Sequence, residues 1–68
     1  MTNTLVAKKF AVRITIKDLD TCKIYSDEYV VYTYCKEGAV EVAKRRAYFD
    51  YPIANGSLDI DYAYELKV

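Results

Sequence analysis

Two cysteines and a pair of nearby aspartates are the first candidates for chemistry in this sequence. The chain has no histidine, so Cys22 and Cys35 lack the commonest base that activates a cysteine nucleophile. They also lack the Cys-x-x-Cys spacing of zinc sites. Asp59 and Asp61 could pair their carboxylates for metal binding or acid–base chemistry, but a solvated strand face with basic neighbours is the simpler interpretation. We therefore predict no enzymatic activity, no cofactor and no metal site.

The cysteines also bear on the cellular compartment. The sequence opens with a polar Met-Thr-Asn-Thr stretch and shows no basic region followed by a long apolar run, so we expect no secretory signal. Cys22 and Cys35 are then expected to be reduced, small buried hydrophobes in a cytoplasmic protein, with a disulfide between them as the alternative. The longest apolar runs are a few residues, whereas a bilayer span needs roughly 20, so we predict no membrane insertion.

Composition points to a small binding domain. The 68 residues are 53% hydrophobic, which is enough for one core but not for two. Ten basic residues balance ten acidic ones, whereas nucleic-acid binders usually carry a basic excess. Eight tyrosines stand out, because tyrosine combines a large rigid surface with a polar tip and suits interfaces. Binding to another macromolecule is the function this composition favours.

Three segments have the alternation of β-strands. In residues 8–18, Phe10, Val12, Ile14 and Ile16 alternate with polar or small residues. In residues 57–67 the alternate positions are Leu58, Ile60, Tyr62, Tyr64 and Leu66, continuing to Val68, which predicts that Tyr62 and Tyr64 pack under a covering element. Residues 22–34 are also β-rich, but the alternation breaks near Ser26-Asp27-Glu28. That break predicts a bulge or a strand interruption and leaves the direction of Tyr29 open.

Between the second and third strands the period changes to that of a helix. Residues 37–50 place their apolar side chains within one arc, which Tyr51 continues. The arc comprises Ala39, Val40, Val42, Ala43, Ala47, Phe49 and Tyr51. Pro52 cannot continue the helix, and Asn55-Gly56 predicts a permissive turn.

These elements predict one α+β domain over residues 1–68, with residues 1–7 as a flexible N-terminus. The order is β-β-α-β, and the helix is expected on one face of a three-stranded antiparallel sheet with strand order 2-1-3. Oppositely charged side chains would then meet on the face away from the helix, and the second strand would present an uncharged edge. The predicted partner-binding residues are Arg13, Lys17, Tyr29, Tyr32, Asp59, Asp61 and Glu65.

The strand opening Lys8-Lys9-Phe10, the β-β-α-β order and the helix from Glu37-Gly38-Ala39 to Ala47 resemble small phage early proteins. They are similar to the RNA polymerase inhibitors of T7-like phages, a likeness that covers about residues 8 to 67. The resemblance implies a viral, bacteriophage protein that takes over or inhibits a host protein in the bacterial cytoplasm. Anti-CRISPR and other anti-defence proteins are similar in size. The family carries arginines on its last strand, where this chain has acidic residues, which weighs against the same target.

Two further hypotheses remain. A nucleic-acid-binding module would use Lys8, Lys9, Lys44, Arg45 and Arg46, although zero net charge speaks against it. A homodimer would form by pairing of the second strands, because a core of this size is marginal.

Overall fold

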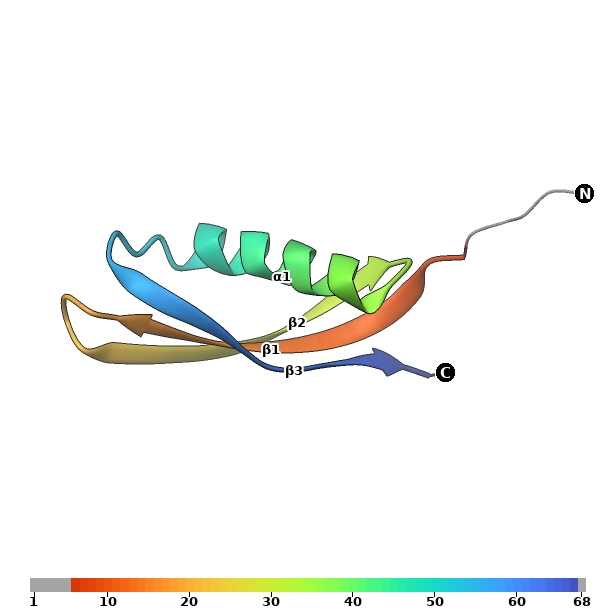
Figure 1. The fold of residues 1–68 in the computed structure, drawn as a ribbon, viewed down its shortest axis with the longest axis horizontal. Coiled ribbons are helices and arrows are strands. Elements are labelled where there is room, and N and C mark those ends of the chain that lie inside the picture. Colours follow the sequence, from red (N-terminus) through yellow and green to blue (C-terminus); the bar gives the residue numbers. More distant parts are fainter. Residues whose placement is uncertain (1–5, 68) are drawn as a thin grey trace, which may run out of the picture.

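The computed structural model describes residues 6–67 as three strands and one helix. The elements are β1 (Lys8–Asp18), β2 (Lys23–Thr33), α1 (Lys36–Asp50) and β3 (Gly56–Leu66). The strands form one antiparallel sheet of order β2-β1-β3, and α1 lies across one of its faces (Figure 1). The predicted α+β fold and strand order are confirmed. The predicted element bounds hold within one residue. Most of the predicted flexible N-terminus (residues 1–5) and Val68 lie outside the described residues.

The core lies between α1 and the central strand β1. Phe10, Val12, Ile14 and Ile16 point toward the helix and are at most 6% exposed. The helix meets them with a stripe of fully buried alanines, Ala39, Ala43 and Ala47, which recur every four residues along one face. Because alanine side chains are short, the larger side chains of the sheet fill the interface.

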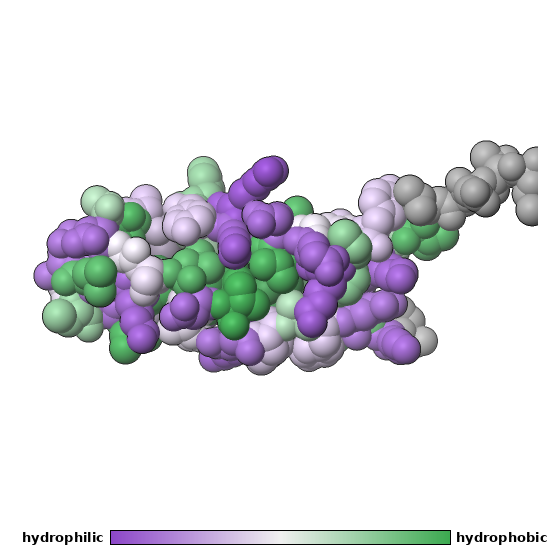
Figure 2. Space-filling view, in the orientation of Figure 1, coloured by the Kyte–Doolittle hydropathy of each residue, from purple (hydrophilic) through white to green (hydrophobic). Residues whose placement is uncertain are grey.

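The buried face of α1 is narrower than predicted. The predicted apolar arc is partly wrong, because Phe49 lies about 200° around the helix from buried Ala47 and is 86% exposed. At the border of the core, three further side chains are only partly buried: Val42, Leu58 and Ile60. Figure 2 shows apolar side chains reaching the surface along the seam between α1 and the sheet.

Strand β2 runs without interruption. Its pairing with β1 proceeds one residue at a time from Lys8↔Thr33 to Asp18↔Lys23, so the predicted bulge or break in this strand is wrong. The alternation is disturbed because Asp27 occupies a position that faces the helix. There its carboxylate accepts a hydrogen bond from the Tyr51 hydroxyl at 3.2 Å. At this position the hydrogen-bonded carboxylate of Asp27 stands where strict alternation would place an apolar side chain.

The irregularity lies in β3. Arg13 pairs with Tyr62, but the next residue, Ile14, pairs with Ile60. Asp61 is therefore an extra residue, and β3 contains a β-bulge at this point.

The bulge changes which side chains of β3 face the helix. Before it, Leu58 and Ile60 point toward α1 and pack against the core. After it, Ala63 takes that direction, while Tyr62 and Tyr64 point to the opposite face. The prediction that these two tyrosines pack under the helix is wrong for this reason.

The two cysteines lie at opposite ends of β2, and both are exposed. Cys22 is in the turn before the strand with a φ of 60°. Cys35 caps α1, where its Sγ accepts a hydrogen bond from the Gly38 N–H at 3.4 Å. The expectation of buried cysteines is wrong. The intervening strand spans about 35 Å, far beyond disulfide reach within one molecule.

Two tyrosine hydroxyls tie the end of α1 to β2. The Tyr29 hydroxyl donates to Asp50 at 2.8 Å, and the Tyr51 hydroxyl donates to Asp27. The ring of Tyr51 also lies 5.2 Å from that of Tyr25, centroid to centroid. Burial raises the pKa of Tyr29, and the hydrogen bond to Asp50 raises it further.

The two glycines predict opposite responses to alanine. Neither glycine has a positive φ, so the backbone freedom expected of an Asn-Gly turn is not used. The effect of alanine then depends on the space around the added Cβ atom. A Cβ at Gly56 would stand 2.5 Å from the Lys17 carbonyl oxygen, so Gly56→Ala should destabilise the fold by about 1–3 kcal/mol. At Gly38 the nearest atom, Cys35 Sγ, would be 3.5 Å away, so Gly38→Ala should stabilise the helix by about 0.5–1 kcal/mol. Denaturant unfolding measures both. A neutral Gly56→Ala would contradict this packing.

Tyr29 predicts a loss of stability at alkaline pH. Tyrosine in the unfolded chain releases its proton at about pH 10, whereas folded Tyr29 retains it because its pKa is raised. The stabilisation is complete below that pH and is lost as the pH rises above it. Tyr29→Phe should lower stability at neutral pH by about 1 kcal/mol and flatten the alkaline decline. Unfolding free energies across neutral and alkaline pH test this, and an unchanged alkaline slope in Tyr29→Phe would refute it.

Candidate interaction surface

The sheet face away from α1 is not covered by any element of residues 6–67 (Figure 1). We call it the open face. Strand alternation and pairing place fifteen side chains on it, and the bulge adds Asp61. They are Ile24, Ser26, Glu28, Val30 and Tyr32 from β2, Lys9, Ala11, Arg13, Thr15 and Lys17 from β1, and Ser57, Asp59, Tyr62, Tyr64 and Leu66 from β3.

One half of the open face is mainly apolar and aromatic, with Lys9 between Tyr32 and Leu66. Ala11 forms its floor and is only 1% exposed, because its neighbours Val30 and Tyr64 stand on either side of it. Tyr64 is 49% exposed and Tyr32 66% exposed. We call Val30, Tyr32, Tyr64 and Leu66 around Ala11 the tyrosine patch. It offers rigid apolar surface with hydroxyl groups at its rim.

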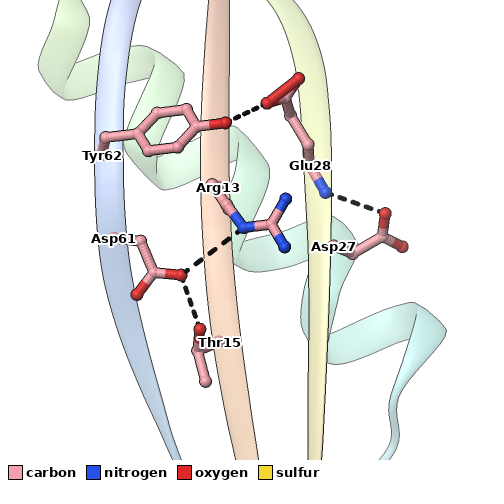
Figure 3. Close-up of polar contacts among 6 residues, drawn as sticks. All are labelled: Arg13, Thr15, Asp27, Glu28, Asp61 and Tyr62. Atoms are coloured by element: carbon pink, nitrogen blue, oxygen red, sulfur yellow. Dashed lines mark hydrogen bonds and ion pairs between the residues drawn. The ribbon is translucent and has the colours of Figure 1, made fainter.

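The other half holds a polar cluster that links all three strands (Figure 3). Arg13 Nε lies 4.0 Å from Asp61 Oδ2, and the Thr15 hydroxyl donates to the same oxygen at 2.6 Å. The Tyr62 hydroxyl reaches across β1 and donates to the Glu28 carboxylate on β2. These five side chains are the polar cluster. Its contacts hold the side chains in place on the sheet.

The polar cluster keeps the Tyr62 hydroxyl protonated and leaves much of the Arg13 side chain exposed. The hydrogen bond to Glu28 is the main cause that raises the pKa of Tyr62, with burial second, while the nearby Arg13 opposes the shift. Tyr62 is therefore a neutral donor at physiological pH. The Arg13 and Asp61 side chains are 44% and 38% exposed, so their ion pair contributes at most about 1 kcal/mol.

Most of the predicted partner-binding residues lie on the open face. The structure brings Arg13 and Asp61 together, as their strand positions indicated. Lys17, Asp59 and Tyr32 are exposed on the same face. Their pairing positions place Lys17 and Asp59 toward one end of the sheet and Tyr32 toward the other.

Two predicted residues do not belong to this surface. Tyr29 faces the helix and is buried, so it cannot contact a partner there. Glu65 pairs with Phe10 and therefore lies on the helix side of the sheet, not beside Arg13. The bulge is the reason, because it reverses the faces of all β3 residues that follow it.

Sequence reasoning missed Tyr62 and Tyr64 as surface residues. Their rings lie 5.4 Å apart, centroid to centroid, on the open face. The available signal was the number of tyrosines, since eight are more than so small a core buries.

The basic residues of the nucleic-acid hypothesis do not form one surface. Lys44, Arg45 and Arg46 belong to α1, on the other side of the sheet from the open face. Lys9 is on the open face, whereas Lys8 pairs with Thr33 on the helix side.

Within residues 6–67 no three potential ligands gather to hold a metal ion. No helix in this part of the chain has both the length and the apolar character needed to cross a bilayer.

Comparisons with protein-family models, with curated proteins and with solved structures gave no match, so the functional assignment depends on the geometry of the open face.

Proposed function

We propose that this chain is a non-enzymatic protein that binds a host protein through the open face and inhibits it by occupying its surface. The single observation that supports this most is the tyrosine patch beside the polar cluster on an uncovered sheet. Aromatic side chains and arginine are enriched where proteins bind one another, and they account for much of the binding energy.

The open face is preorganised for binding. Its side chains stand on paired strands, and Asp61 and Glu28 already orient Arg13 and Tyr62. Little side-chain freedom is then lost when a partner docks, which favours affinity.

The charges of the open face are balanced, with three of each sign. They are Lys9, Arg13, Lys17, Glu28, Asp59 and Asp61. A mixed pattern of this kind attracts a complementary surface and disfavours others, so it supports a specific protein target.

The resemblance to the RNA polymerase inhibitors of T7-like phages supports a bacterial host target in the cytoplasm. RNA polymerase and the defence or CRISPR machinery are the target classes that we propose. Inhibition by occupancy requires one molecule of this protein for each target molecule.

Matched tyrosine variants test the proposal. Tyr32→Ala and Tyr64→Ala each remove an aromatic side chain from the tyrosine patch, while Tyr48→Ala removes a tyrosine of intermediate exposure (62%) from the helix. In affinity capture from bacterial lysate, both patch variants should weaken the captured partner's binding by about tenfold or more. Tyr48→Ala should retain the same partner at the wild-type yield. Retention by the patch variants, or equal loss in all three, would contradict the proposal.

A second candidate function is single-stranded nucleic-acid binding, because the tyrosines on the open face lie where bases could stack. A shallow hollow next to Tyr32 is lined by Lys8, Lys9 and Lys67, together with the acidic Glu65.

A titration with mixed-sequence single-stranded DNA and RNA tests this second candidate. Affinity should fall as salt rises, with a slope of about 0.7 per neutralised phosphate, and Tyr64→Phe should bind while Tyr64→Ala should not. Absence of binding at low salt and micromolar protein would remove this candidate.

A further inference from the structure

The two edges of the sheet differ in how they resist pairing with another chain. β2 and β3 each pair only with β1 among the described residues, so each has a free outer edge. On β3, the charges of Asp59, Asp61 and Glu65 and the bulge all disfavour the addition of a strand.

The β2 edge has none of these protections over Tyr29–Thr33. This stretch contains no charge and no proline, and its regular pairing with β1 shows that it has no bulge. Val30 and Tyr32 are 42% and 66% exposed, so they could contact a neighbouring strand. An uncharged edge of this kind is a template for strand addition.

We propose that β2 pairs with β2 of a second copy of this chain, antiparallel and about a two-fold axis perpendicular to the sheet. The product is a continuous six-stranded sheet with both helices on the same side. This inference depends on the edge of β2 and not on the proposed function of the open face.

The charges along β2 limit the registers that this pairing can adopt. Around a two-fold axis, residues that oppose each other must share a face, and the central residue opposes itself. Centring on Glu28 would oppose two carboxylates and is disfavoured. Centring on Val30 opposes the two Val30 side chains and places Glu28 opposite Tyr32. Centring on Val31 opposes Val30 and Tyr32, and again no like charges meet.

A second copy also fits the stability of the chain. Ten described hydrophobic residues are buried, three of them helix alanines, which is a small core for an independent domain. Pairing of the β2 edges satisfies the free backbone groups of both copies and covers part of Val30 and Tyr32. It also places the two open faces side by side.

Charge variants at Val30 test the pairing, because this residue lies at or next to the axis. Sedimentation equilibrium from micromolar to hundreds of micromolar should give a dimer for the wild type. Val30→Lys and Val30→Glu should each weaken the dimer by about tenfold or more, since like charges would lie opposite or diagonal to each other across the interface. An equimolar mixture of the two should restore the dimer mass.

Two controls separate the β2 edge from the open face. Ile24→Lys changes an exposed residue of the same strand and face, outside the paired stretch. Tyr64→Lys changes the open face next to the other edge. Both should remain dimeric. Val31 does not serve as a probe, because it is 3% exposed and packs under the helix.

Hydrogen exchange adds a backbone readout. Amides in Tyr29–Thr33 should exchange more slowly in the wild-type dimer than in Val30→Lys. A wild type that is monomeric at every concentration would overturn the proposal. A dimer that Val30→Lys leaves intact, or that Tyr64→Lys disrupts as strongly, would overturn it as well. Partner capture by a monomeric wild type would still support the proposed function, so the two can fail separately.

Discussion

The fold depends on β1 being paired on both sides and covered on one face. Its helix-facing residues from Phe10 to Ile16 form the centre of the core, and both other strands take their register from it. The alanine stripe of α1 closes this core with little side-chain volume of its own. The single helix covers one face of the three-stranded sheet, so the opposite face keeps its surface for other uses.

The bulge at Asp61 separates the two uses of β3. The half of the strand before Asp61 supplies Leu58 and Ile60 to the core, and the half after it directs Tyr62 and Tyr64 to the open face. The same extra residue brings its carboxylate to Arg13 and Thr15. One inserted residue thus completes the polar cluster and exposes the aromatic side chains that make the open face suitable for binding.

Tyrosine serves both sides of this small domain. Under the helix, the hydroxyls of Tyr29 and Tyr51 find carboxylate partners at the ends of packed rings. On the open face, Tyr62 does the same with Glu28, while Tyr32 and Tyr64 remain largely exposed. A residue with an apolar body and a polar tip can be buried or exposed at modest cost. Here that property allows a limited core and a broad interaction surface to share one short chain.

The sequence by itself determined the elements, their order and the buried stripe of α1, because the periods of strand and helix are local properties of residues such as Phe10 to Ile16 and Ala39 to Ala47. The same alternation placed Arg13, Lys17, Asp59 and Asp61 on the candidate surface. Only the tertiary structure decided the directions of Tyr62, Tyr64 and Glu65, since tyrosine fits either face and its alternation does not reveal a bulge. The direction of Asp27 was equally hidden, because the hydroxyl that satisfies it belongs to Tyr51 beyond the helix. Contacts between residues distant in the chain have no local signal.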